Sequence, residues 1–348
     1  MLDDAPAAIC SGRGFLCGGS GFMEQEKGVM QCSFLACVIW LAALPAGAAA
    51  DEPAPEVGRC SMWVDSYRGE PVPYEAVVDD LAGVRVVYLG ERHRLVRHHE
   101  MQARIIADLA ARGRRLVVGL EQIEATRQPV VDRFNAGQLD FEQLAEATDW
   151  AKRWPNYQQY RPVLEAARKA NAPLVALNAP AETIRQVARG GGVEQLDPEL
   201  RRQLPREMML DDEPYARLLG IYMHVHLAAT PERLRPMVEA QIARDEHMAD
   251  VLARFLQSPE GKDRMAVVVC GVGHVSYALG MPARVRRRLD DGSDRVVVFS
   301  ESGDVQLTPG EQAVSRPITI THEQLRAMGR PIGDYLYLVT PAHGDRPD

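Results

Sequence analysis

Polar side chains follow four buried apolar runs of this 348-residue sequence, at the point where each run ends. The runs are VRVVYLG (84–90), RLVVGLE (115–121), PLVALNA (173–179) and MAVVVCG (265–271). Their uninterrupted, β-branched character is typical of parallel strands covered on both faces. The carboxyl ends of such strands share one edge of the sheet, where sites form. We therefore expect one crevice lined by the side chains at these ends: Glu91, His93, Glu121, Asn178 and His274.

Two kinds of chemistry fit this set of residues. Buried charges need partners, so the cluster indicates a metal, a proton relay or a bound ligand. Glu91, His93 and His274 carry donor atoms suited to a divalent metal ion. A carboxylate, Glu91 or Glu121, would then act as general base toward a water, and His274 would stabilise the developing oxyanion of an ester or amide. Imidazoles can instead ligate a haem iron, and the residues alone leave both hypotheses open.

Several other functions are disfavoured by the sequence. It has neither a GxSxG nor an HExxH motif, which argues against serine-hydrolase and zincin chemistry. The net charge of −8 argues against a general nucleic-acid binder. His224, His226 and His247 are interpreted as surface or core side chains. Asp245 shares a helical face with Gln241 and Met248. It is interpreted as a surface charge, with a position facing the crevice as the alternative.

The elements that position these residues predict an α/β fold with a largely parallel β-sheet flanked by helices. Two further strands are predicted at 295–302 and 334–341, whereas 51–80 is predicted to be irregular. The strands alternate with helical segments, as in βαβ units. We expect an α/β core at about 80–122, 172–180 and 262–342. A smaller helical insertion domain is expected at about 125–170 and 181–256.

The first fifty residues are predicted to be an N-terminal extension and signal peptide, followed by one domain at 51–348. Residues 34–45 have the length of a signal-peptide apolar region, and Ala48 and Ala50 form a cleavage site. Secretion across the inner membrane, to the periplasm or the envelope, would follow. Lipidation at Cys37 is the alternative, and translation could start at Met23 or Met30. In an oxidising compartment Cys60 and Cys270 could pair, with a buried free thiol at 270 as the alternative.

Five segments resemble, in order, the ChaN-like haem-binding uptake proteins of the Tiki superfamily, from about residue 84 to residue 288. They are GERHRLVRHHEMQARII, LVVGLEQ, DWAKRWPNYQQYRPVLEAARKANAPLVALNAP, AQIARDEHMA and CGVGHVSYALGMPARV. The resemblance implies an α/β domain with a smaller helical domain. It also implies a secreted or lipid-anchored protein that binds haem and serves iron uptake. An outer-membrane haem receptor or transport system is the expected partner, and a homodimer is left open.

The resemblance also implies roles for individual residues. The haem ligand itself is not fixed by the matching motifs, and its candidates are His93, His98 and Tyr277. Arg97, or the nearby Arg92 and Arg94, would pair with a propionate. Tyr157 and Tyr160 lie in matching segments, but Tyr160 is expected to pack under the sheet. Tiki-like metalloproteases and erythromycin-esterase-like enzymes of the same superfamily use related acidic and histidine motifs. The counterparts of those motifs in this sequence are Glu91, His93, Glu121 and His274. They support the alternative hypothesis that the protein is a metal-dependent hydrolase.

Overall fold

The computed structural model describes residues 61–226, 231–301 and 329–339, all within one compact unit of the chain. The expected signal peptide, its cleavage and lipidation sites, and Cys60 lie outside the described residues. No helix in the described ranges is both long and apolar enough to cross a membrane.

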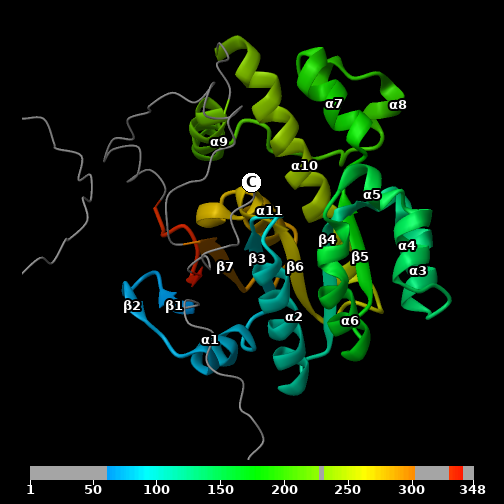
Figure 1. Ribbon diagram of the computed structural model, residues 1–348. Helices are drawn as coiled ribbons and strands as arrows, with labels where there is room; N and C mark the ends of the chain where they lie inside the picture. The colour runs from blue at the N-terminus through cyan, green and yellow to red at the C-terminus, as the bar shows by residue number, and fades with distance from the viewer. Residues whose placement is uncertain (1–60, 227–230, 302–328, 340–348) are drawn as a thin grey trace, which may run out of the picture. The chain divides into compact units, whose positions relative to one another are not determined.

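An eight-stranded sheet, ordered β2-β1-β8-β7-β3-β6-β4-β5, forms the centre of the fold (Figure 1). The six predicted strands are all present: β3 (Val86–Glu91), β4 (Leu116–Glu124), β5 (Leu174–Asn178), β6 (Met265–Gly271), β7 (Asp294–Glu301) and β8 (Tyr335–Val339). They pair in parallel, with β6 between β3 and β4. The predicted fold class is therefore confirmed, and the carboxyl ends of β3, β4 and β6 meet at one edge.

Two strands lie in the segment predicted to be irregular, so that part of the prediction is wrong. β1 (Ser61–Asp65) pairs antiparallel with β8, and the two-residue β2 (Glu70–Pro71) pairs with β1. Residues of β1 and their partners in β8 are 270 or more positions apart in the sequence. Local propensity carries little information about such a strand, because its stability depends on the neighbour it pairs with.

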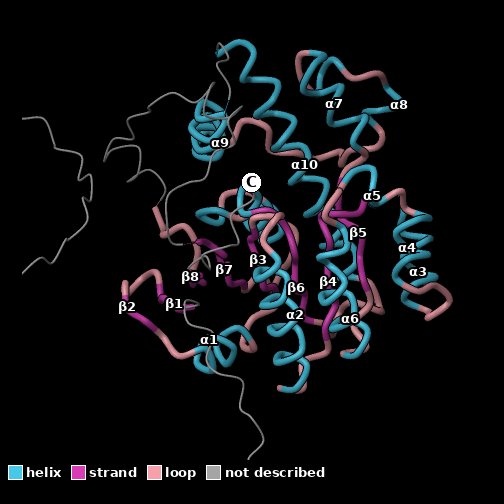
Figure 2. The backbone as a smooth tube through the Cα atoms, in the orientation of Figure 1, coloured by secondary structure: helices cyan, strands magenta, loops and turns pink. Residues whose placement is uncertain are grey.

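Helices cover both faces of the sheet, as the tube in Figure 2 shows. The helices are α1 (Tyr74–Leu81), α2 (Val96–Ala111), α3 (Gln128–Asn135), α4 (Phe141–Ala147), α5 (Trp150–Arg153), α6 (Arg161–Lys169), α7 (Ala181–Gly190), α8 (Pro198–Arg201), α9 (Glu213–His226), α10 (Pro231–Gln257) and α11 (Met281–Arg286). Short 3-10 turns include η2 (Tyr157–Tyr160), η4 (Val272–His274) and η5 (Ser276–Ala278).

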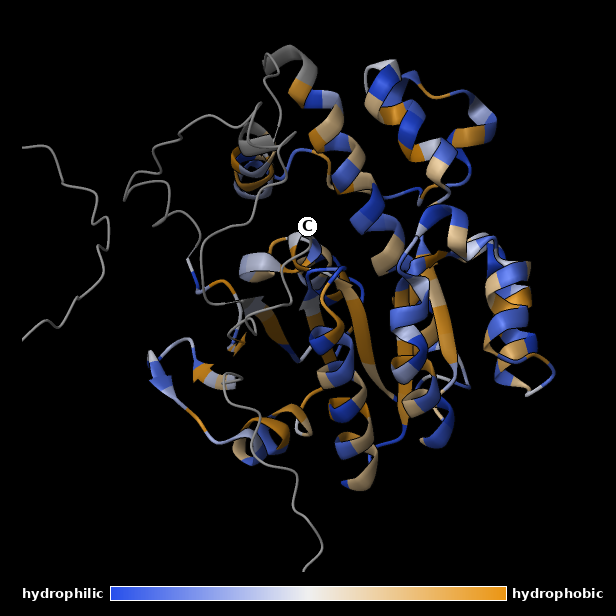
Figure 3. Cartoon of the chain, in the orientation of Figure 1, coloured by the Kyte–Doolittle hydropathy of each residue, from blue (hydrophilic) through white to orange (hydrophobic). Residues whose placement is uncertain are grey.

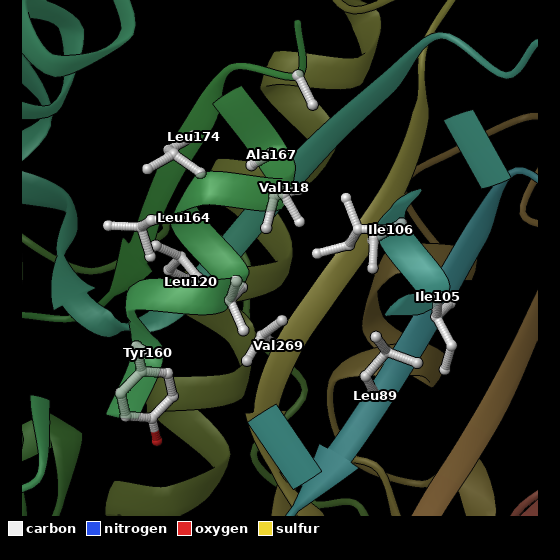
Figure 4. Close-up of a cluster of buried hydrophobic side chains, with 14 of the residues drawn as sticks. Leu89, Ile105, Ile106, Val118, Leu120, Tyr160, Leu164, Ala167, Leu174 and Val269 are labelled. Carbon is white, nitrogen blue, oxygen red and sulfur yellow. The ribbon is translucent and has the colours of Figure 1, made fainter. Parts of the chain in front are cut away.

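Alternate residues of each strand serve two different apolar layers, because successive side chains of a strand point to opposite faces. Val87 and Leu89 pack in the layer under α2 and α6 (Figure 4), whereas Val86 and Tyr88 pack in the layer under α10 and α11. Figure 3 shows the strands as apolar ribbons within more polar helices. Each fully buried aliphatic side chain contributes about 1.5–3 kcal/mol, so these two layers provide the main apolar stabilisation.

The helical segments predicted as an insertion divide between the sheet and a separate cluster. α6 packs beside α2, and Met248, Ala249 and Leu252 of α10 pack on the opposite face of the sheet. Residues of α7, with Leu204, Ala240 and Ala243, form a smaller apolar cluster of their own. α10 therefore links the sheet to this smaller helical cluster.

Candidate functional site

Glu91 is the last residue of β3, and its carboxylate is fully buried. Donors surround both of its oxygens. The contacts are Nδ1 of His93 at 2.8 Å, Nε2 of Gln102 at 2.7 Å, Nε2 of Gln122 at 3.2 Å, Nε2 of His99 at 3.2 Å, and the Tyr160 hydroxyl. Burial alone would raise the pKa of Glu91, but the His93 and His99 contacts outweigh it and lower the pKa to about 2. Glu91 is thus an ionised, fully engaged acceptor.

His93 lies in the loop after β3 and is the most accessible of the strand-end imidazoles. Its side chain is 33% exposed, and its ring meets Trp154 edge-on with the centroids 4.6 Å apart. Nδ1 faces Glu91, whereas Nε2 makes no hydrogen bond with the described residues. Burial opposes protonation, but the Glu91 hydrogen bond and the charge of Glu121 outweigh it and raise the pKa of His93.

His274, in η4 after β6, is held between two carboxylates. Nε2 lies 3.1 Å from Oε1 of Glu121, and Nδ1 lies 2.5 Å from Oδ1 of Asp245. All three side chains are at least 94% buried. Burial would lower the pKa of His274, but the two carboxylates raise it to about 10. The same pairing lowers the pKa of Glu121 against the effect of its burial. His274 is therefore an imidazolium with both nitrogens occupied.

The interpretation of Asp245 as a surface charge is wrong, and the alternative, a side chain that faces the strand-end site, agrees with the structure. α10 crosses the carboxyl edge of the sheet and buries this side chain completely. Its second oxygen accepts a hydrogen bond from the Tyr215 hydroxyl at 2.5 Å, and the Gln241 amide lies 2.9 Å from Nδ1 of His274. The four-residue spacing of Gln241 and Asp245 is the one sign in the sequence that these two side chains act together, because it places both on one face of the helix.

Gly271 joins the Glu91–His93 pair to the Glu121–His274 pair. It ends β6, between the strands that carry Glu91 and Glu121, and its N–H donates to Oε2 of Glu121 at 2.7 Å. A Cβ at this position would lie only 2.7 Å from Nε2 of His93 and 3.6 Å from the Glu121 carboxylate. The absent side chain therefore makes room for the His93 ring beside Glu121.

Asn178 and Tyr160 also reach this edge. Asn178, the last residue of β5, donates its amide to the backbone oxygen of Glu121 at 2.8 Å. Tyr160 packs in the apolar layer under the sheet, as expected, but Figure 4 shows its hydroxyl pointing away from the aliphatic side chains. That hydroxyl donates to Glu91. Tyr160 is therefore a positioning residue, a role beyond the packing that its sequence context predicts.

The residues predicted to hold haem do not lie in one place. His98 is completely buried against Phe299, and its Nδ1 accepts the backbone N–H of Arg92. Burial lowers its pKa to about 3, so it is a core histidine and cannot face an external ligand. Arg97 lines a cavity of about 280 Å³ between α2, β1 and β8. Tyr277 lies in η5 with a φ of 55° and packs beside α9.

The predicted metal set is also not assembled. Among the residues that the structure describes, no group of three or more His, Cys, Asp or Glu side chains is arranged to hold a metal ion. Glu91 is engaged by His93, whereas His274 is engaged by Glu121 and Asp245. Cys270 is a buried free thiol in β6. This agrees with the second of the two alternatives given above for this residue, a free thiol in place of a disulfide.

Comparison with known proteins identifies the family. The sequence matches the family described as haem-binding uptake, Tiki superfamily, ChaN, over residues 77–285. A solved structure of ChaN from Campylobacter jejuni, described as showing cofacial haem binding, has a similar fold. Its TM-score is 0.59 at 19% identity, covering 81% of this chain and 97% of that one. An erythromycin esterase mutant in its open conformation has a TM-score of 0.45 at 11% identity, covering 82% and 99%. No curated protein matches the sequence.

Proposed function

The chain belongs to the ChaN-like haem-binding uptake family of the Tiki superfamily, and on that premise we propose that it binds haem through Nε2 of His93. Haem bound there would supply an iron, and an imidazole nitrogen is a usual ligand of haem iron. Cofacial haem binding by the Campylobacter jejuni relative supports a site of this class. We further propose a role in haem and iron uptake at the bacterial envelope.

The observation that carries this proposal is the 2.8 Å contact between Nδ1 of His93 and the buried Glu91 carboxylate. Metal-ligating histidines usually give their second ring nitrogen to a carboxylate, which fixes the ring orientation and strengthens the ligand. Nε2 is left without a hydrogen bond to the described residues, on a side chain that is one-third exposed. Trp154 adds a fixed aromatic neighbour. His93 thus has the carboxylate support that is usual for an iron ligand.

A haemin titration tests the proposal. We expect a saturable Soret shift with the wild-type protein at micromolar haemin, and a large loss of affinity in His93→Ala. Tyr277→Phe is the parallel variant, because tyrosinate also ligates ferric haem. If the Soret shift is lost in Tyr277→Phe but kept in His93→Ala, the haem ligand is Tyr277 and not His93. A flat titration with the wild-type protein would reject haem binding at this site.

The cellular part of the proposal needs separate measurements. Export is supported by the apolar run and cleavage site of residues 34–50. We expect the N-terminus of protein isolated from a bacterial periplasm to begin at Asp51, whereas an acylated Cys37 would show lipid anchoring. Light scattering with and without haemin would show whether a homodimer forms. Growth on haemin as the iron source, with and without a disrupted gene, tests the role in uptake through an outer-membrane receptor or transport system.

A hydrolase is the second candidate, and the buried Glu121–His274–Asp245 arrangement favours it. A haem ligand needs no imidazolium held between two carboxylates, whereas such a chain can store and move a proton in a dry environment. Glu121, next to the accessible His93, would be the general base toward water. Ester and peptide hydrolysis by wild type and Glu121→Gln, with metal analysis before and after chelation, tests this candidate. Equal rates in both proteins would reject it.

A further inference from the structure

A cavity lies away from the strand-end site, on the outer side of α10. It has a volume of about 700 Å³, within the usual range of small-molecule sites. Its walls come from three places in the sequence: residues 202–207 after α8, the C-terminal half of α10, and residues 287–288 after α11. These separate segments together surround a space large enough for a small ligand.

The charge of this cavity is opposite to that of the whole chain, which carries −8. Five arginines line it: Arg202, Arg206, Arg254, Arg287 and Arg288. Two carboxylates share the wall with them, Asp250 and Glu207. The buried Glu246 and the exposed Glu199 pair with them from outside the wall, which leaves an excess of one positive charge. Arg206 makes no ion pair with any described residue, and Arg202 lies 3.8 Å from an exposed Glu199. The Arg206 guanidinium thus has no carboxylate partner among the described residues, and that of Arg202 has only this long contact.

A buried polar atom in the same wall lacks a partner. His247 is 8% exposed, and its Nε2 is buried without a hydrogen bond to any described residue. Leaving a buried polar atom unsatisfied costs free energy, and native structures contain few such atoms.

The cavity is separate from the strand-end site because α10 lies between them. Asp245 and His247 are two residues apart, and helical residues at this spacing point to opposite sides of the axis. Asp245 contacts His274, whereas His247 faces the cavity. A ligand here would not touch His93 or His274.

We propose that this cavity binds a small polyanion of the phosphate-ester class. The guanidinium fork matches phosphate oxygens in a bidentate manner. Arginines on three walls, in a space larger than one inorganic ion needs, favour a molecule with two or more phosphate groups. The surplus of positive charge would be neutralised by such a ligand.

Calorimetry with pyrophosphate tests the proposal on the full chain without haem. We expect saturable binding, a higher melting temperature, and at least about tenfold weaker binding in the double variant Arg202→Gln/Arg206→Gln, since each lost charge-assisted hydrogen bond is worth more than the roughly 1.4 kcal/mol that tenfold represents. Both side chains are exposed, so the fold should persist. Arg217→Gln, an exposed arginine of α9, is the matched control and should bind as the wild type does.

Three outcomes would overturn the proposal. The first is no saturable pyrophosphate binding up to millimolar concentration. The second is unchanged binding in the double variant Arg202→Gln/Arg206→Gln, and the third is citrate binding as tightly as pyrophosphate, which would show a carboxylate site. Because no cavity residue contacts His93, haemin titrations of the same variants should match the wild type. Failure of this proposal is therefore separable from failure of haem binding.

Discussion

Nδ1 of His274 lies 2.5 Å from Oδ1 of Asp245, on the side of the imidazole ring away from Glu121. Helix α10, strand β4 and the end of strand β6 thus meet at the protonated imidazole ring of His274. Removing one partner of a buried ion pair leaves an uncompensated charge. The fold and the electrostatics of the site therefore depend on the same three side chains.

Asp245→Asn should lower both the pKa of His274 and the stability of the fold. We expect a loss of about 3 kcal/mol in the free energy of unfolding, the scale of a broken buried pair. Asp250→Asn, which breaks a partly exposed pair with Arg254 on the same helix, should cost less than about 1 kcal/mol. Urea titration at pH 7 measures both values. Equal small losses would show that Asp245 has no special electrostatic role.

Stability should fall as the pH rises from 7 toward 8.5. The pKa of His274 is about 10 in the folded protein and 6.5 as the reference value. The contribution of His274 to the free energy of unfolding is therefore complete below pH 6.5, and it disappears as the pH rises through 10. Over the intermediate range this group lowers the free energy of unfolding by about 1.4 kcal/mol per pH unit. Denaturant titrations at several pH values measure the slope, and imidazole NMR should show His274 still protonated at pH 8.5.

Tyr160→Phe should destabilise the protein because it removes one donor from the buried Glu91 carboxylate. Hydrogen bonds to charged groups contribute about 1.5–3 kcal/mol, and we expect a loss in that range. Tyr157→Phe is the control, since within the described residues its hydroxyl accepts one hydrogen bond, from the exposed Gln158 amide. Thermal unfolding of both variants should separate them clearly. A Tyr160→Phe protein as stable as the control would show that the hydroxyl does not support the Glu91 carboxylate.

Gly271→Ala should displace His93, because the added Cβ would lie 2.7 Å from its Nε2. We expect at least about tenfold weaker haemin binding and an overpacking cost of about 1–3 kcal/mol. Gly273→Ala is the matched control, since its Cβ would meet no atom within 4 Å. Haemin titration and urea unfolding measure the two effects. Unaltered haemin affinity in Gly271→Ala would argue against ligation by Nε2 of His93.

The sheet was predictable because each parallel strand is a continuous apolar run, and so was the edge where polar residues gather. The side chains that contact those polar residues were harder to predict from the sequence. The spacing of Gln241 and Asp245 defines a helical face, but what that face packs against depends on where α10 crosses the sheet. His98 and His99 are adjacent, yet only His99 lies beside Glu91. Successive residues of a helix are rotated by about 100°, and only the packed structure shows which of them meets the carboxylate.

Gly271 lies directly opposite Glu91 in the β3–β6 pairing. A one-residue insertion within β6 would shift every later residue to the other face of the sheet and put a side chain opposite Glu91. An insertion in the loops at the opposite edge would leave this register unchanged. The site should therefore tolerate changes in loop length far better than any change in the length of its central strand.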